Sequence, residues 1–222
     1  NTAREGSNNW GTYTSAVSAG GINASGGTIG SVESWDGSSW TEIVDLNVAR
    51  RRSGTSGGDN TSGLLFGGDG PAPAHVASTE FFDGSSWTEV ADLGTARTMT
   101  ASAGHETGSS LAIGGTSSTA DVASTEEFES PSAFGQLSDG QCFFRSDTGD
   151  FKITLTQYGT GAWASGGAMP AARNSGIGDA GTQTAALAFG GLPTNVTVHY
   201  NGTAWSAPGN DINTNRYSLG SF

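Results

Sequence analysis

The chain has 222 residues and a formal net charge of −12, which excludes the basic surface that a nucleic acid or an anionic membrane would need, so we expect neither partner. Glycine accounts for 36 residues and charged residues for only 14%, but six Trp and ten Phe argue against a disordered chain. The single Cys excludes an intrachain disulfide framework, and no apolar run is long enough for membrane insertion.

The chain begins with Asn-Thr-Ala-Arg (1–4), which matches the end of a repeated unit rather than the start of a protein. The first residue is not Met, and no signal-peptide pattern follows it. We therefore expect the chain to be a piece of something longer.

A repeat of 47 residues organises the units that follow. The string WDGSSWTEIVDLNVAR (35–50) returns as FDGSSWTEVADLGTAR (82–97), with the seven residues from Asp to Glu unchanged. The same offset carries Glu33 to Glu80 and on to Glu127. It also relates successive Gly-Gly pairs and repeat-ending arginines. Several kinds of marker with one spacing indicate a duplicated structural unit, not a catalytic signature used twice.

Between the third and fourth units the spacing of the markers grows from 47 to 76 residues. One insertion of 29 residues, at 130–158, explains the change. We therefore predict a single domain over residues 1–222. Its units are expected at about 4–49, 50–96, 97–172 and 173–215, with the start of another at 216–222.

Each unit is predicted to form four short β-strands. The first follows the Arg, as in RTMTASAG (97–104), and the second is an apolar run closed by Gly-Gly, as in LLFGG (64–68). The third, as in TVHY (197–200), leads into an Asp-Gly or Asn-Gly turn, which supplies the positive φ angles of a tight hairpin. The fourth begins with Trp and pairs antiparallel with the third. Because no helical periodicity of useful length is present, the predicted fold class is all-β.

Three kinds of position are expected to build every unit: the Gly-Gly pair that closes the second strand, the Trp that opens the fourth strand, and the Arg that ends the unit. These positions are Gly20, Gly21, Gly67, Gly68, Gly114, Gly115, Gly190, Gly191, Trp40, Trp87, Trp163, Trp205, Arg4, Arg50, Arg97, Arg173 and Arg216. Five of the nine basic residues are these arginines. We expect each guanidinium to pair with a carboxylate or with carbonyl groups of an adjacent unit, and a ring of arginines for an anionic ligand is the alternative.

The Gly-Gly pair, the aromatic residue near the end of the third strand and the Trp that opens the fourth resemble the kelch repeat, whose period is about 50 residues. The resemblance covers nearly the whole chain apart from the insertion, although the turn between Trp35 and Trp40 is shorter than is usual in kelch units. It implies four-stranded blades stacked radially as a kelch-like β-propeller, with a β-hairpin insertion in the third blade.

A narrower resemblance is to the repeat-rich, kelch-like proteins of marine tailed phages, notably those of cyanobacteria. It rests on AGTQTAALAFGG (180–191), GTGAWASGGAMPAAR (159–173) and NTNRYSLGSF (213–222). The inserted GQCFFRSDTGDFKITLTQYG (140–159) is similar to short β-segments of phage tail-fibre and virion surface proteins. This resemblance implies a virion structural or host-attachment role.

Four visible units are few for a propeller. We favour further blades outside the present sequence. An inserted segment that helps closure, or an open array that a partner closes, remain alternatives.

Signals for catalysis or metal binding are weak. His75, His105 and His199 lie in different units without the spacing of metal ligands, and Cys142 has no nearby His to form a nucleophile pair. A copper site like that of galactose-oxidase-like kelch propellers needs a Tyr/His set that is not recognisable here. We therefore expect no catalytic residue, no metal and no cofactor, and an enzyme of that kind is a remote alternative.

Two acidic motifs favour a structural interpretation. Asp36 and Asp83 lie in strings that resemble the Asp-box of sialidase-type propellers with one residue fewer, and we expect both to bend the chain. The string SDTGD (146–150) offers clustered oxygens for Ca²⁺ but is expected to be a plain hairpin turn.

Recognition is expected in the loops that differ most between units. In a four-stranded meander, the loops between strands two and three share a face with the connections from strand four to the next strand one. Candidate ligand-binding residues on this face are Asn23, Asp69, His75, Asp121 and Asn195. The alternative is that these loops vary because nothing depends on them.

The insertion carries apolar residues at roughly alternating positions, and a hairpin with such a face needs the propeller or a neighbouring subunit to cover it. Phe143, Phe144 and Phe151 are the candidate subunit contacts.

The leading functional hypothesis is a non-enzymatic phage virion protein, in a tail fibre, a spike or the capsid surface, that serves host attachment or assembly. Its expected partners are other virion proteins, identical subunits and a host-surface glycan. The alternative is a bacterial extracellular kelch module that binds protein partners.

Overall fold

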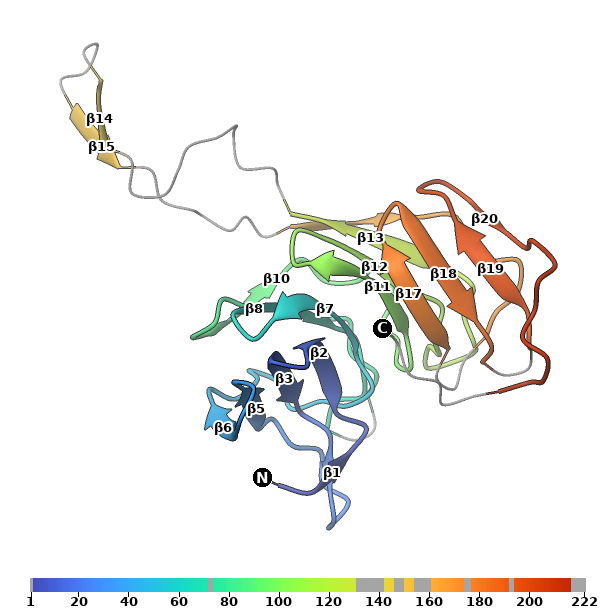
Figure 1. The fold of residues 1–222 in the computed structure, drawn as a ribbon, viewed down its shortest axis with the longest axis horizontal. Helices are drawn as coiled ribbons and strands as arrows, with labels where there is room; N and C mark the ends of the chain where they lie inside the picture. The colour runs from blue at the N-terminus through green and yellow to red at the C-terminus, as the bar shows by residue number, and fades with distance from the viewer. Residues whose placement is uncertain are drawn as a thin grey trace.

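The computed structural model describes residues 2–71, 74–130, 142–145, 150–153, 161–173, 177–191 and 194–216, and only the backbone at 105–106, 142–145, 150–153 and 178. Within these residues the strands form four four-stranded antiparallel sheets and two two-stranded ribbons, without a helix (Figure 1). Each four-stranded sheet keeps its strands in chain order and lies within one of the predicted units. We call these sheets blades 1 to 4.

Blade 1 comprises β2 (Asn8–Thr12), β3 (Ser15–Ala19), β5 (Val32–Trp35) and β6 (Trp40–Ile43). Blade 2 comprises β7 (Gly54–Asp59), β8 (Ser62–Phe66), β9 (Thr79–Phe82) and β10 (Trp87–Val90). Blade 3 comprises β11 (Ala101–Glu106), β12 (Ser109–Ile113), β13 (Thr125–Glu129) and β16 (Ala162–Ser165). Blade 4 comprises β17 (Gly178–Thr182), β18 (Ala185–Phe189), β19 (Thr197–Tyr200) and β20 (Trp205–Ser206).

The two ribbons lie outside the blades. β1 (Arg4–Glu5) pairs with β4 (Ile22–Asn23), which belongs to the connection between the second and third strands of blade 1. β14 (Cys142–Arg145) pairs antiparallel with β15 (Asp150–Ile153) between the third and fourth strands of blade 3. The predicted hairpin insertion in the third blade is therefore confirmed.

The first strands of successive blades, β2, β7, β11 and β17, lie next to one another (Figure 1). Hydrogen bonds between described residues join neighbouring strands of this row. Thr55 Oγ1 donates to the Asn9 carbonyl at 2.9 Å, Thr55 N to Ser102 Oγ at 3.3 Å, and Ser102 N to Asp179 Oδ2 at 2.5 Å. Four-stranded blades that meet at their first strands are the arrangement of a β-propeller, so the predicted fold class is confirmed.

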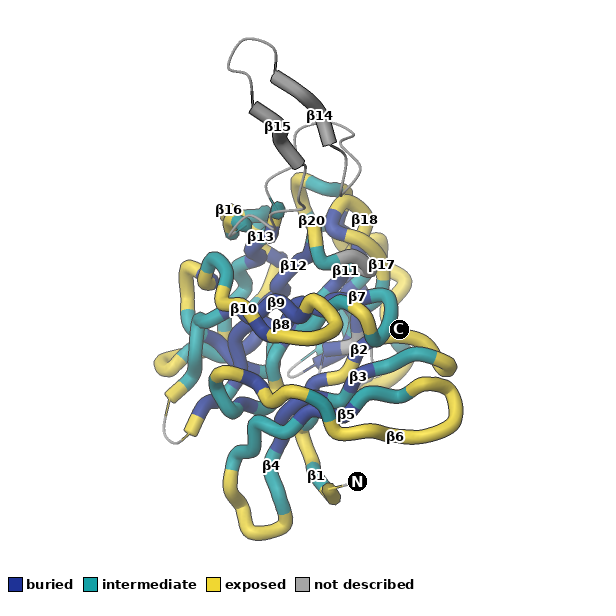
Figure 2. Tube along the Cα trace, turned by 90° about the vertical axis from the view of Figure 1, so that its left-hand side faces the viewer, coloured by how far each residue is buried: buried dark blue, intermediate teal, exposed yellow. Residues whose placement is uncertain are grey.

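The hydrophobic core lies between blades rather than in one centre, and its most continuous buried runs are in β8, β9 and β12, drawn largely in dark blue in Figure 2. Between blades 1 and 2 it holds Trp10, Val17, Ala19, Val32, Leu46, Leu65, Phe82 and Trp87. Between blades 2 and 3 it holds Leu64, Phe66, Phe81, Leu93, Ala112 and Phe128. Because an internal blade packs on both faces, its strands carry apolar runs instead of a clean alternation.

The Trp that opens each fourth strand contacts the preceding blade. The indole N–H groups of Trp87, Trp163 and Trp205 donate to Val44 O, Thr79 Oγ1 and Thr125 Oγ1 at 3.0–3.2 Å. Trp40 differs, because no described blade precedes blade 1. Its side chain is 39% exposed and contacts Trp35, with 5.5 Å between the ring centroids.

Asp36, Asp83 and Asn201 form the turns between the third and fourth strands, as the sequence predicts. Asp83 Oδ1 accepts hydrogen bonds from the backbone N–H groups of Ser85 and Ser86 at 2.8 and 2.7 Å. Asn201 makes the corresponding bonds with its amide oxygen. Hydrogen bonds to the carboxylate lower the pKa of Asp36 and that of Asp83 to about 2, which keeps both groups ionised and unsuited to donate a proton.

The acid titration of Asp83 is a direct check of this turn. Since its pKa is lowered on folding, its contribution to stability is present above the unfolded value of 3.8 and is lost as the pH falls through about 2. Carboxyl ¹³C NMR should therefore give a midpoint near 2 for Asp83 and Asp36. A midpoint near 3.8 would contradict the turn geometry. Asn201 is an internal control, because the amide signals of its turn should not change over the same range.

One offset-based assignment is wrong. The residue of blade 3 that corresponds to Glu33 and Glu80 is Glu126, not Glu127, since it lies two residues before the aromatic that pairs with the Trp of the fourth strand. The connection before β13 is one residue shorter than the connection before β9. Glu127 instead accepts a hydrogen bond from the Tyr200 hydroxyl of blade 4. Burial, together with this bond, raises the pKa of Tyr200 to about 12.

Candidate functional site

One face of the blades gathers two kinds of connection. Because the strands alternate in direction, the links from second to third strands emerge on the same side as the links from fourth strands to the next first strand. We call this side the loop face. Its described residues are 20–31, 67–71, 74–78, 114–124, 190–191 and 194–196 from the first kind, and 44–53, 91–100, 166–173, 177 and 207–216 from the second. Residues 2–7, which lead into β2, lie on the same side.

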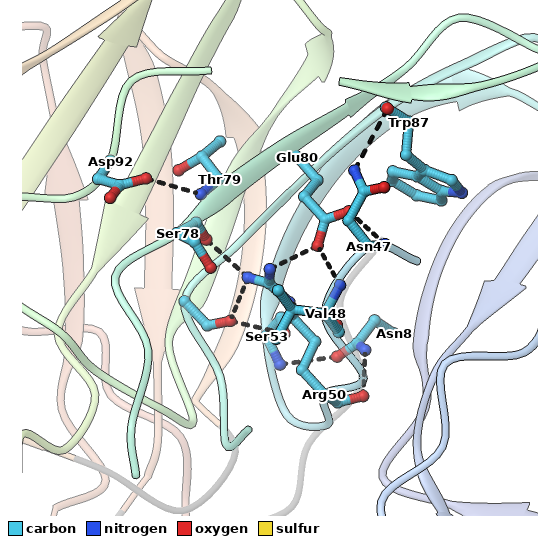
Figure 3. Close-up of polar contacts among 11 residues, drawn as sticks. Asn8, Asn47, Val48, Arg50, Ser53, Ser78, Thr79, Glu80, Trp87 and Asp92 are labelled. Atoms are coloured by element: carbon cyan, nitrogen blue, oxygen red, sulfur yellow. Dashed lines mark hydrogen bonds and ion pairs between the residues drawn. The ribbon is translucent and has the colours of Figure 1, made fainter. Parts of the chain in front are cut away.

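Arg50 joins blades 1 and 2 beneath the loop face (Figure 3). Its carbonyl accepts a hydrogen bond from Gly21 N of blade 1 at 2.9 Å. Its guanidinium group donates to three groups of blade 2: Gly67 O at 3.2 Å, Ser78 O at 2.6 Å and Glu80 Oε1 at 2.5 Å. Main chain and side chain of one residue thus hold different blades together. We call this set of contacts the arginine joint.

The ion pair of this joint is fully buried, with 0% of the Arg50 side chain and 1% of the Glu80 side chain exposed. Burial lowers the pKa of Arg50, and the negative charge of Glu80 opposes that shift. Glu80 also accepts hydrogen bonds from Asn47 N at 2.8 Å and Val48 N at 3.2 Å. It therefore fixes the chain that leaves blade 1 as well as the guanidinium group.

The side-chain contacts of the joint recur at Arg4, Arg97 and, in part, Arg173. Arg4 bonds Gly20 O, Ser31 O and Glu33, and Arg97 bonds Gly114 O, Ser124 O and Glu126. Arg173 bonds Gly190 O and Val196 O, but Val198 takes the place of the glutamate. These are the expected carboxylate and carbonyl contacts. Such buried or largely buried guanidinium groups offer little to a ring of arginines that binds an anion.

Arg216 has the main-chain contact of the joint without the side-chain contacts. Its carbonyl accepts from Gly191 N at 2.9 Å, as in the internal joints. Its exposed side chain donates to Thr214 Oγ1 at 3.3 Å and makes no ion pair within the described residues. Arg216, Asp211, Asn213, Ile212 and Phe189 line an open depression of about 420 Å³.

Above each of the first three joints, three segments of the loop face pair as a short ribbon. In blade 1 the paired residues are Glu5, Ile22 and Thr28. In blade 2 they are Arg51, Asp69 and His75, and in blade 3 they are Thr98, Thr116 and Asp121. The same backbone frame therefore presents different side chains at each blade.

Blade 2 has the most polar of these ribbons. His75 Nδ1 lies 2.8 Å from Asp69 Oδ1, while Arg51 Nε and Arg52 Nη1 lie 3.4 and 3.8 Å from Asp69 Oδ2. Asp69 and His75 were candidate ligand residues, and the fold brings them together. Arg51 and Arg52 were not among the predicted site residues. The only signal was that they extend the repeat-ending arginine into a run that the other units lack.

The other candidate ligand residues have different roles. Asn23 Oδ1 accepts from the backbone N–H groups of Ser25 and Gly27 at 3.1 and 3.0 Å and forms a turn. Asn195 Nδ2 donates to Ile212 O at 2.9 Å and ties two connections together. Asp121 accepts from Thr116 Oγ1 at 3.1 Å at the surface. Only Asp69 and His75 of the five lie side by side.

The remaining candidates add no further cluster. His199 is exposed on β19, while the side chains of His105, Cys142, Phe143, Phe144 and Phe151 and the residues 146–149 lie outside the described part of the chain. Among the described residues no group of three or more His, Cys, Asp or Glu side chains is arranged to hold a metal ion. None of the elements described there is a helix that could cross a membrane. A small cavity of about 110 Å³ lies between blades 2 and 3 beside Leu64, Phe81 and Phe128.

Comparison with known proteins bears on the fold. No protein-family model matches the chain, and no curated protein matches its sequence. A solved structure titled "Structure of YjhT" is similar with a TM-score of 0.70 and 11% sequence identity, over 98% of this chain and 73% of that chain. At this identity the similarity shows the fold alone: an all-β chain of four-stranded antiparallel sheets arranged as repeated blades.

Proposed function

We propose that the chain is a non-enzymatic recognition module of a phage virion surface, and that its loop face attaches to a host-surface glycan. One observation carries the proposal. The ribbons of blades 1 to 3 repeat one hydrogen-bonded backbone frame but change the side chains at the same three positions. Loops that vary on a fixed scaffold are a usual place for recognition.

The frame suits binding because it is ordered before a ligand arrives. In blade 2, Arg51 N donates to Asp69 O at 3.0 Å and Asp69 N donates to Arg51 O at 2.8 Å. Thr98 and Thr116 exchange the same pair of bonds in blade 3, both at 2.9 Å. A ligand that binds such a surface does not have to order the loops, so less of the interaction free energy is lost.

The virion location rests on the sequence resemblance to repeat-rich phage proteins. A structural role among virion proteins or identical subunits is supported by exposed apolar side chains. Tyr13, Trp40 and Val44 are 91%, 39% and 44% exposed, and all three belong to blade 1. They suit a protein contact on blade 1. Phe143, Phe144 and Phe151 of the insertion remain proposed subunit contacts.

Purified particles of a phage that encodes the chain provide the test. Antibodies against the chain should label intact particles, and a glycan array probed with the isolated chain should give saturable binding. Unlabelled particles from which the chain is absent by mass spectrometry would overturn the virion assignment. If the particles are labelled but the isolated chain binds no glycan, the assembly role is retained and the attachment role is rejected.

A protein-binding extracellular module of a bacterium is the second candidate, and the exposed side chains of blade 1 favour it as well. Neighbouring genes separate the two, since capsid and tail genes beside this one support the virion assignment.

A further inference from the structure

Positive charge is scarce in this chain and is concentrated at one point of the loop face. Of the nine Lys and Arg residues, five are the repeat-ending arginines, and Arg145 and Lys152 belong to the insertion. The remaining two, Arg51 and Arg52, are adjacent in sequence and contact Asp69, which also contacts His75. A cationic group in a chain of net charge −12 has no general solubility role to explain it.

In the cluster formed by Arg51, Arg52, His75 and Asp69, the basic side chains are more exposed than the carboxylate. The Arg51, Arg52 and His75 side chains are 25%, 40% and 27% exposed, whereas Asp69 is 17% exposed. Arg51 and Arg52 bring two positive charges against the single negative charge of Asp69, so the cluster keeps a net positive charge. Asp69 holds the cations in place without neutralising them.

The two arginines differ from those of the joints in their hydrogen bonds. The Arg50 guanidinium group donates to four acceptors: the carbonyls of Val48, Gly67 and Ser78, and the Glu80 carboxylate. By contrast, neither Arg51 nor Arg52 donates a side-chain hydrogen bond to the residues that the structure describes, and both contact the Asp69 carboxylate only as ion pairs at 3.4 and 3.8 Å. A guanidinium group carries five N–H donors in a planar fork that matches the oxygens of a carboxylate or phosphate. The cluster therefore has donors to offer an oxyanion.

Arg52 is held in a conformation that a side chain disfavours. Its φ is +54°, in the left-handed region, where the first repeat has Gly6 (φ +62°) and the third has Met99 (φ +52°). Backbone hydrogen bonds of 3.0 Å from Arg52 N to Gly6 O and from Met99 N to Arg52 O hold it there. The positive φ recurs at this position of the first three repeats, so it belongs to the fold, and it fixes where the Arg52 side chain leaves the backbone.

We propose that Arg51, Arg52 and His75, arranged around Asp69 on the loop face of blade 2, bind an oxyanion substituent of the glycan that this face recognises. The substituent is a carboxylate or a phosphate group, whose paired oxygens accept from the two guanidinium forks. The inference rests on the proposed glycan recognition and gives the ligand its chemical class: an anionic polysaccharide rather than a neutral one.

The test uses a variant that removes the charge without harming the fold. Arg52→Gly deletes the guanidinium group at a position where Gly adopts the required φ freely, so its thermal unfolding should not begin earlier than that of the parent. Met99→Gly is the matched control, because it relieves the same backbone strain and keeps every cation. Binding to alginate, which carries carboxylates, to a phosphorylated dextran and to plain dextran is measured by biolayer interferometry at two salt concentrations.

The parent and Met99→Gly should bind at least one of the two charged polymers, more weakly at high salt, with affinities within about twofold of each other. Arg52→Gly should bind about tenfold to a hundredfold more weakly, as expected for loss of a charged hydrogen bond. The polymer preferred by the parent identifies the group as carboxylate or phosphate.

Two results overturn the site. One is equal binding of a charged polymer by the parent and Arg52→Gly. The other is the absence of binding to both charged polymers. If the chain then binds plain dextran or another neutral glycan, the proposed glycan recognition survives without the oxyanion site. If it binds no glycan of any kind, the proposed attachment role fails as well.

Discussion

Replacing Glu80 by Gln is expected to lower the free energy of unfolding by about 3–5 kcal/mol, because it leaves the buried charge of Arg50 without a counter-ion. The Arg50 side chain is 0% exposed, so water cannot take over the role of the carboxylate. Glu80 also holds Asn47 N and Val48 N, and weakening these bonds adds to the loss. Urea unfolding followed by Trp fluorescence measures the change, and the melting temperature should fall by roughly 10 °C.

The control for this substitution is Glu89→Gln. Glu89 lies opposite Glu80 in the β9–β10 pair but is exposed, so the same chemical change should alter stability by less than about 0.5 kcal/mol. The double variant Arg50→Met with Glu80→Leu should lose less free energy of unfolding than the sum of the losses of its two single variants, because no charge is then buried alone. Equal stability of Glu80→Gln and Glu89→Gln would show that the joint does not hold the blades.

Gly20→Ala is expected to destabilise the chain by about 3 kcal/mol or more. Gly20 has a φ of +63°, and a Cβ there would lie well inside van der Waals contact with the Arg50 carbonyl oxygen. That carbonyl accepts from Gly21 N, so the added methyl group strains the conformation and separates the two sides of the arginine joint. Circular dichroism during urea unfolding records the loss.

Gly26→Ala separates the two causes. Gly26 also has a positive φ, +81°, but a Cβ there meets nothing within 4 Å. Only the conformational strain remains, and the expected cost is about 1 kcal/mol. If Gly20→Ala cost no more than Gly26→Ala, the close approach of Arg50 to the Gly-Gly pair would have to be rejected.

The blades were predictable because their defining residues act locally and recur at one spacing. The Gly-Gly pairs supply positive φ angles at the ends of second strands, and Asp83 or Asn201 bends the hairpin that follows. These effects depend on a few neighbouring residues, so copies with the same residues form the same structure. The repeat therefore predicted strand order and the place of the insertion.

A fixed repeat offset gave wrong predictions where a connection changed its length or where a unit had a different neighbouring blade. Because Glu126 and Glu127 are adjacent, the sequence alone did not reveal the one-residue deletion in the connection before β13. Trp40 has the same sequence context as Trp87, yet it is 39% exposed while Trp87 is 7% exposed. Burial of this Trp depends on the preceding blade, which the unit itself does not encode.

The cluster of blade 2 could be predicted only in part. Asp69 and His75 were found because they lie in a loop that varies between units. Their proximity to Arg51 depends on the pairing of three segments above the joint. No local sequence pattern predicts that pairing. Because Arg51 and Arg52 have no counterparts in other units, a search for repeated residues passes over them.

The arginine joint also bears on how such a chain can lengthen. Arg50 and Arg97 each place the carbonyl in one blade and the guanidinium group in the next, so the stretch from one arginine to the following one contains half of a joint at each end. A gene duplication of that stretch would insert a blade whose two flanks already match their new neighbours. The seven-residue identity between the first two units is consistent with a copy made in this way. Because a duplicated blade already carries both halves of the joint, the side chains of its exposed ribbon can vary without loss of the fold. Related chains could change their ligand in this way.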